Sequence, residues 1–147
     1  MARVRLVAVV ALLLALVVVP SATPSSTGQQ HALVILGTSG GQPYTVGDVQ
    51  AVARETADFY HSSSLGQLNL DFDITPWLHA FTADPGCGFT SQSTFDALMQ
   101  PARLAAQRAG YKPSDYPRLI YILADSRCAF FGTTWGQEVT LTREPTV

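Results

Sequence analysis

The chain has 147 residues, 14% of them charged and 10% aromatic, with nine Lys and Arg against eleven Asp and Glu. This composition is typical of one packed globular domain and excludes an intrinsically disordered chain. The net charge of −2 argues against nucleic acid or an anionic membrane surface as a partner.

Residues 1–26 have the features of a secretory signal peptide. Arg3 and Arg5 precede an unbroken apolar run over residues 6–19, and small residues follow it. This order is typical of an export signal, and we expect cleavage between residues 21 and 26. A transmembrane anchor is the alternative, but it needs about 20 apolar residues. We therefore predict a secreted or extracytoplasmic protein without a stable membrane anchor.

The mature chain should begin with a flexible tail and continue as one domain. Residues 27–31 are polar and have no periodicity, so we expect a flexible N-terminal tail. Residues 32–36, ALVIL, are wholly apolar, which is typical of a strand buried on both faces. Residues 32–147 are expected to form a single α/β domain.

A first helix is predicted from a capping pattern. Thr45 and Asp48 match the S/T-x-x-D/E form of a capping box. Glu55 and Asp58 should lie on the solvated side of this helix. The apolar side should be one buried stripe at helical spacing, formed by Val49, Val52, Ala53, Thr56, Phe59 and Tyr60.

Residues 66–74 have the clearest strand pattern in the sequence. Polar residues alternate there with Leu68, Leu70, Phe72 and Ile74, which predicts an edge strand with one solvated face. Asp71 and Asp73 fall on that face about 7 Å apart, a spacing suited to a calcium site or an acid–base pair. Because the alternation already accounts for both carboxylates, we interpret them as solvated.

A second helix and a third strand complete the pattern. Ser93 and Asp96 offer another capping box, and Pro101 should kink or split the helix near Met99. Its buried stripe should be Phe95, Leu98, Met99, Ala102, Ala105, Ala106 and Ala109. Residues 119–123, LIYIL, form the third strand. The order β-α-β-α-β predicts a small three-layer α/β domain with a mixed or mostly parallel sheet.

The two cysteines, Cys87 and Cys128, are predicted to form a disulfide. An exported protein meets an oxidising compartment, in which such pairs form and persist. A zinc pair is the alternative, but neither cysteine has a CxxC partner or a nearby histidine.

The pattern G-x-S-x-G at residues 37–41 makes Ser39 a weak candidate nucleophile. A nucleophile elbow also needs an acid and a histidine, and pairs such as Asp48 with His61, or Asp73 with His79, have no supporting context. A glycine-rich turn with an incidental serine is the favoured interpretation. The histidines at 31, 61 and 79 contain no i, i+4 pair, so no metal site is predicted.

The aromatic residues allow two interpretations. They could form a carbohydrate- or peptide-binding platform, or they could pack locally near strand ends, which is the commoner arrangement. The residues concerned are Trp77, Phe81, Phe89, Phe130, Phe131 and Trp135.

Several segments carry a resemblance to a known family. LVIL and QPYTVGDVQ are followed by Ser64–Leu70 (SLGQLNL), Trp77–Leu78 and Tyr116–Tyr121 (YPRLIY), in that order. With these segments, most of residues 32–136 resembles the front half of secreted gametolysin-like zinc metallopeptidases of the metzincin group. The resemblance implies a fold like the N-terminal part of a metzincin catalytic domain. In full-length relatives it also implies zinc and a protein or peptide substrate.

The sequence departs from that family where the chemistry resides. The family's catalysis rests on a helix with the motif H-E-x-x-H-x-x-G-x-x-H, in which the histidines hold zinc and the glutamate acts as general base. No HExxH occurs in the 147 residues, so no catalytic or zinc-binding residue can be assigned from the resemblance. We expect an incomplete domain, inactive on its own, that exposes apolar strand edges. The alternatives are a secreted non-enzymatic peptide- or glycan-binding module and, less favoured, a serine hydrolase that uses Ser39.

Overall fold

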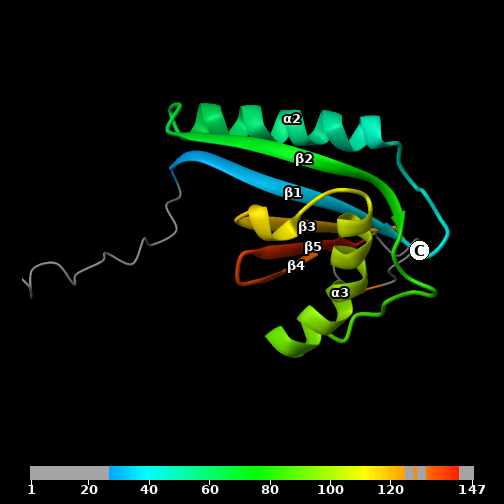
Figure 1. The fold of residues 1–147 in the computed structure, drawn as a ribbon. Helices are drawn as coiled ribbons and strands as arrows, with labels where there is room; N and C mark the ends of the chain where they lie inside the picture. The colour runs from blue at the N-terminus through cyan, green and yellow to red at the C-terminus, as the bar shows by residue number, and fades with distance from the viewer. Residues whose placement is uncertain (1–26, 125–127, 129–131, 143–147) are drawn as a thin grey trace, which may run out of the picture.

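The computed structural model describes residues 27–124, 128 and 132–142, so the expected signal peptide at 1–26 lies outside the described residues. Figure 1 shows the elements, which are β1 (Gly28–Thr38), α2 (Val46–Ser63), β2 (Leu68–His79), α3 (Gln92–Arg108), η1 (Pro113–Asp115), β3 (Arg118–Leu123), β4 (Gly132–Trp135) and β5 (Glu138–Thr142). Within the described part of the chain, no helix has the length and apolar character needed to span a membrane.

The strands form one five-stranded sheet in the order β2-β1-β3-β5-β4. β1 pairs in parallel with β2 and β3, β3 pairs in parallel with β5, and only β4 runs antiparallel to its neighbour. α2 and α3 lie on opposite faces of this sheet (Figure 1). The predicted α/β class, the β-α-β-α-β order and the mostly parallel sheet are therefore confirmed. The sequence patterns predicted neither β4 nor β5.

The main core lies between the sheet and α3. Leu33 and Ile35 of β1 and Tyr121 of β3 are fully buried there. The predicted stripe of α3 is buried at Phe95, Met99, Ala102, Ala105 and Ala106.

The start and middle of α3 differ from the prediction. The N-cap is Ser91, whose hydroxyl accepts from the N–H of Thr94, so the expected box at Ser93 and Asp96 is wrong. Pro101 lies inside a single helix, so the expected split does not occur. The buried apolar stripe on both sides of Pro101 explains why the helix continues, since packing compensates for the lost hydrogen bond.

The first strand begins earlier than predicted. Gly28–His31 pair in register with Leu68–Asp71, so the expected flexible tail at 27–31 is wrong from Gly28 onward. Backbone hydrogen bonds to β2 fix these residues in the sheet. Because β2 is distant in the sequence, the local composition of 27–31 could not predict this pairing.

The β1–β2 pairing also has a register shift between Val34 and Leu36. At the shift the Thr75 hydroxyl accepts a hydrogen bond from the buried N–H of Leu36 at 3.0 Å. The Thr75 side chain thus takes the place of a backbone hydrogen bond between the two strands. β2 continues past Pro76 to His79.

Helix α2 has the predicted cap but not the predicted burial. The Thr45–Asp48 capping box is present, and Glu55 and Asp58 are exposed as expected. No residue of α2 is buried, and Val52 and Phe59 are 62% and 66% exposed. The prediction of one buried stripe is therefore wrong, because α2 lies mainly over the edge strand β2 (Figure 1).

The predicted disulfide between Cys87 and Cys128 is present, with an S–S distance of 2.05 Å and a Cα–Cα distance of 5.5 Å. It links the loop between β2 and α3 to the segment that follows β3. The crosslink therefore joins two connections at the end of the sheet where β3 stops.

Removing the crosslink should lower stability. The bridged residues are 41 positions apart, and closing a loop of that length is worth about 4 kcal/mol in the chain-entropy account. Urea unfolding of the Cys87→Ser/Cys128→Ser variant should show a free energy of unfolding lower by up to that amount. Reductant should destabilise the wild type but leave the variant unchanged. Equal unfolding midpoints for the two proteins would contradict this prediction.

Candidate functional site

The main concave feature is an apolar trough between α2 and the sheet. At one end it is a cavity of about 260 Å³ lined by Tyr44, Val52, Ile122 and Leu141. At the other end it is a cavity of about 330 Å³ whose lining includes Tyr60. Val49 and Thr56, each about one helical turn from Val52, also line these cavities. So does Ile120, two positions before Ile122 on the same strand. We call these two cavities together the trough. Its wall is α2, and its floor is formed by β3 and β5 at the first end and by β1, β2 and the start of β3 at the other.

The trough exists because one helix cannot cover this face of the sheet. A helix with its side chains is about 10 Å wide and neighbouring strands are about 4.8 Å apart, so one helix covers about two strands. Four parallel-paired strands, β2, β1, β3 and β5, are therefore wider than α2 alone can cover. On the α2 side, Ala32, Val34 and Leu36 of β1 are buried, whereas Ile120 and Ile122 of β3 are only half-buried.

Exposed apolar side chains gather around the trough. Tyr44, Val52, Tyr60 and Leu141 all line it, with exposed fractions between 40% and 62%. Phe59, 66% exposed, lies two turns from Val52 on the same flank of α2. Elsewhere in the described part of the chain, the exposed large apolar residues are Leu65 and Leu104. Such clustering marks a binding surface more often than scattered exposure does.

The two ends of the trough carry opposite charges. Asp48 lines the end near Tyr44, where its Oδ2 accepts from the Thr45 hydroxyl and the Thr45 N–H, each at 2.8 Å. These two hydrogen bonds hold the pKa of Asp48 below its ordinary value. Arg118 lines the other end and donates from Nε to Gln30 Oε1 at 3.3 Å.

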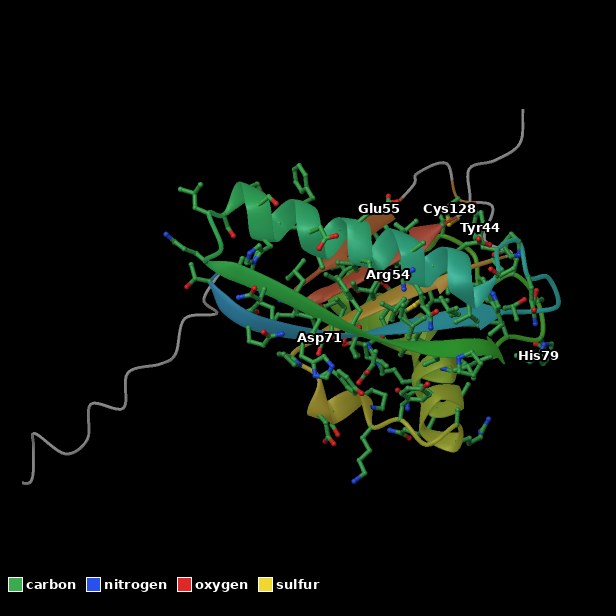
Figure 2. All side chains as sticks on the ribbon, turned by 90° about the horizontal axis from the view of Figure 1, so that it is seen from above. Tyr44, Arg54, Glu55, Asp71, His79 and Cys128 are labelled. Atoms are coloured by element: carbon green, nitrogen blue, oxygen red, sulfur yellow. A yellow bond between two sulfur atoms is a disulfide. The ribbon has the colours of Figure 1, made fainter. Side chains whose placement is uncertain are left out.

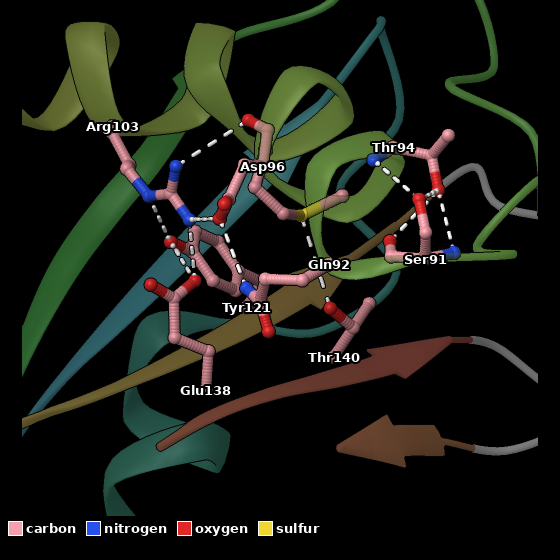
Figure 3. A network of polar contacts seen from close by, with 9 residues as sticks. Ser91, Gln92, Thr94, Asp96, Arg103, Tyr121, Glu138 and Thr140 are labelled. Carbon is pink, nitrogen blue, oxygen red and sulfur yellow. Dashed lines mark hydrogen bonds and ion pairs between the residues drawn. The ribbon is translucent and has the colours of Figure 1, made fainter. Parts of the chain in front are cut away.

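On the opposite face, a polar network joins α3 to β3 and β5 (Figure 3). Arg103 Nη2 lies 2.6 Å from Glu138 Oε2 and 3.1 Å from Asp96 Oδ1. Arg103 Nε donates to the Tyr121 hydroxyl at 2.7 Å, and that hydroxyl donates to Glu138 Oε2 at 2.9 Å. Every charge in the network has a partner, so we interpret it as a structural link rather than a catalytic centre.

The network shifts the pKa values of its members. Burial raises the pKa of Tyr121, and the charge of Glu138 raises it further. Burial alone would lower the pKa of Arg103, but its hydrogen bonds and charge contacts with Glu138 and Tyr121 outweigh burial, so the pKa is raised. Tyr121 therefore stays neutral and Arg103 stays charged across the physiological range.

Among the described residues, the partners predicted for Ser39 are not assembled into a serine-hydrolase site. β1 ends at Thr38 and α2 begins at Val46, so no sharp strand-to-helix turn presents Ser39. His79 pairs with Thr38 beside Ser39, but Asp73 lies six residues along β2, about 20 Å away. Asp73 instead receives a hydrogen bond from Tyr116 at 2.6 Å.

The exposed face of β2 holds a small charged cluster. His31 Nε2 lies 3.2 Å from Asp73 Oδ2 and 3.8 Å from Asp71 Oδ2, and the His31 ring is 4.9 Å from that of Tyr116. The hydrogen bond to Asp73 raises the pKa of Tyr116 to about 12. Both aspartates are exposed, as predicted, and Asp71 and His79 lie well apart on β2 (Figure 2). His61 lies elsewhere and contacts Asn69.

Across the described residues, no group of three or more His, Cys, Asp or Glu side chains is placed to hold a metal ion. The predicted aromatic residues are also dispersed. Phe81 belongs to the core, Phe89 and Trp135 pack against it, and Trp77 Nε1 donates to Tyr44 O at 2.8 Å. Phe130 and Phe131 lie outside the described residues.

Comparison with the profiles of known protein families, with curated proteins and with solved structures found no match.

The cap of α2 should give stability a specific pH dependence. Folding lowers the pKa of Asp48. The ionised carboxylate therefore stabilises the fold at pH values above 3.8, the ordinary pKa of this group. That contribution should disappear as the pH falls through the lower folded value. The difference in unfolding midpoint between wild type and Asp48→Asn should therefore shrink between about pH 5 and pH 2. The difference should be smaller at every pH in a Thr45→Val background; a pH-independent difference would contradict the prediction.

Breaking the network around Arg103 should destabilise the protein. Arg103→Met leaves Glu138 and Asp96 without their cation, which for a largely buried pair costs about 3 kcal/mol. Urea unfolding measures this loss. Arg108→Met, the same change at an exposed site on α3, should stay within about 0.5 kcal/mol of wild type. Similar losses in the two variants would show that the network is not the cause.

Proposed function

We propose that this chain is an exported, non-catalytic scaffold resembling the front half of a gametolysin-like zinc metallopeptidase. Its working surface is the trough beside α2. The single observation that carries this proposal is the clustering of exposed apolar side chains around one open half of a parallel sheet. Such a sheet needs cover on both faces, so a surface of this kind binds rather than catalyses.

Three features support the non-catalytic part of the proposal. The sequence has no HExxH, and the described residues contain no cluster suited to a metal ion. Ser39 is not presented on a nucleophile elbow, since seven residues separate the end of β1 from α2. Arg103, Tyr121 and Glu138 satisfy one another within the protein. None of these groups offers a nucleophile or a base beside a cavity.

A secreted binding module outside that family is the second candidate. The same trough favours it, because an apolar concave surface recognises a protein segment. A glycan platform has less support, since Phe81, Phe89 and Trp135 pack in or against the core.

Catalytic activity decides the first part of the proposal. We expect the purified mature chain, loaded with Zn²⁺ and dialysed, to leave casein intact over many hours. Atomic absorption should find less than one tightly held zinc per chain, because a structural or catalytic site needs at least three protein ligands. A gametolysin-like peptidase assayed in parallel controls for the substrate. Cleavage that a chelator stops and Zn²⁺ restores would refute the proposal.

A further inference from the structure

We propose that the trough binds one amphipathic α-helix of a protein partner, which lies antiparallel to α2 over β3 and β5. This inference rests on the proposed function, in which the trough is the working surface, and it names the partner. The helix partner and the non-catalytic scaffold can be refuted separately. It rests on the shape of the trough, its apolar lining and the charges at its ends.

The shape of the trough fits a helix. Its wall, α2, has 18 residues and is about 27 Å long, and its floor along β3 has six residues and is about 20 Å long. β3 and β5 together are about as wide as one helix, and β4 lies beyond them at the edge of the sheet. A second helix placed there would complete the layer that α2 begins.

The lining fits the apolar face of such a helix. The floor presents Ile120, Ile122 and Leu141, and the wall presents Val52. A helix with apolar residues at i, i+3, i+4 and i+7 would bury both surfaces at once. This also explains why the apolar stripe of α2 is wider than its contact with β2 requires.

The charges at the ends set the direction. Asp48 lies at one end of the trough and Arg118 at the other, and no salt bridge to Arg118 occurs among the described residues. Helices favour acidic residues in the first turn and basic residues in the last. A partner helix of this ordinary kind places its basic end at Asp48 and its acidic end at Arg118 when it runs antiparallel to α2.

A second copy of the chain fits this surface poorly. To fill the trough of its neighbour, a copy would have to insert the outer side of its own α2. That side carries the exposed carboxylates of Glu55 and Asp58, which would lose water against Ile122 and Leu141. The apolar flank at Val52 is already turned toward the copy's own trough.

The test uses a fluorescein-labelled 18-residue helical peptide with a leucine stripe, glutamates in its first turn and lysines in its last. Fluorescence anisotropy with the mature protein should show saturable binding. Leu141→Glu should weaken the affinity at least about tenfold, because it puts a charge against the apolar face of the bound helix. Leu104→Glu is the matched control, because Leu104 and Leu141 are 38% and 40% exposed and only Leu141 lines the trough. It should change the affinity less than about twofold.

Two further peptides test the chemistry and the direction. A scrambled peptide of the same composition, without the stripe, should not bind. A peptide with its terminal charges exchanged should bind about threefold or more weakly, since each end then meets a like charge. Val52→Glu, 62% exposed on the wall, replaces Leu141→Glu if circular dichroism shows that the latter is unfolded.

Absence of binding, or equal weakening by Leu141→Glu and Leu104→Glu, would overturn the inference. So would size-exclusion chromatography that shows a dimer lost in Leu141→Glu, because the occupant would then be a second copy. If these tests fail and casein is left intact, the proposal of a helix partner is refuted but the proposal of a non-catalytic scaffold is not. Zinc-dependent cleavage of casein removes the scaffold proposal whether or not the peptide binds.

Discussion

The structure depends on the requirement that a parallel sheet be covered on both faces. On one face α3 meets this requirement with Phe95 and Met99 packed on Leu33, Ile35 and Tyr121. On the other face α2 covers only the β2 side, and Ile120, Ile122 and Leu141 remain partly accessible. Within the described part of the chain, α2 is too narrow to cover that face, so the trough stays open, and the scaffold and helix-binding proposals both follow from it.

The two faces also differ in how firmly they are fixed. α3 is held by its apolar stripe, by the Arg103–Glu138 ion pair and by a hydrogen bond from Thr140 to Met99 (Figure 3). α2 has no buried side chain, and it relies on its cap and on contacts with β2. Local opening is easiest where buried apolar contacts are fewest. A partner bound in the trough would thus stabilise the part of the domain that needs it most.

Local patterns in the sequence predicted a large part of this fold. The alternation in residues 66–74, the apolar run LIYIL and the cap at Thr45 identified β2, β3 and α2 because each pattern reflects neighbours close in the chain. Long-range effects were missed. β1 extends back to Gly28 because β2 pairs with it, and β4 and β5 are short strands without a strong alternation.

The trough could be predicted only in part, for the same reason. The wide apolar stripe of α2 was visible in the sequence, but its division into a covered half and an open half depends on where α2 lies on the sheet. The disulfide needed only the number of cysteines and the expected compartment. The Arg103 network joins residues 18 and 35 positions apart, so no local motif could reveal it.

The free edge of β2 has a consequence for how copies of this protein can associate. Pro76 has no N–H to donate, and Asp71 and Asp73 place like charges along the same strand. These features oppose strand addition, and at the far edge β4 has only four residues. Strand-to-strand association of copies is therefore disfavoured at both edges of the sheet. Growth into fibrils needs an open strand edge; β2 has 12 residues but carries Pro76 and two aspartates, and β4 has only four residues.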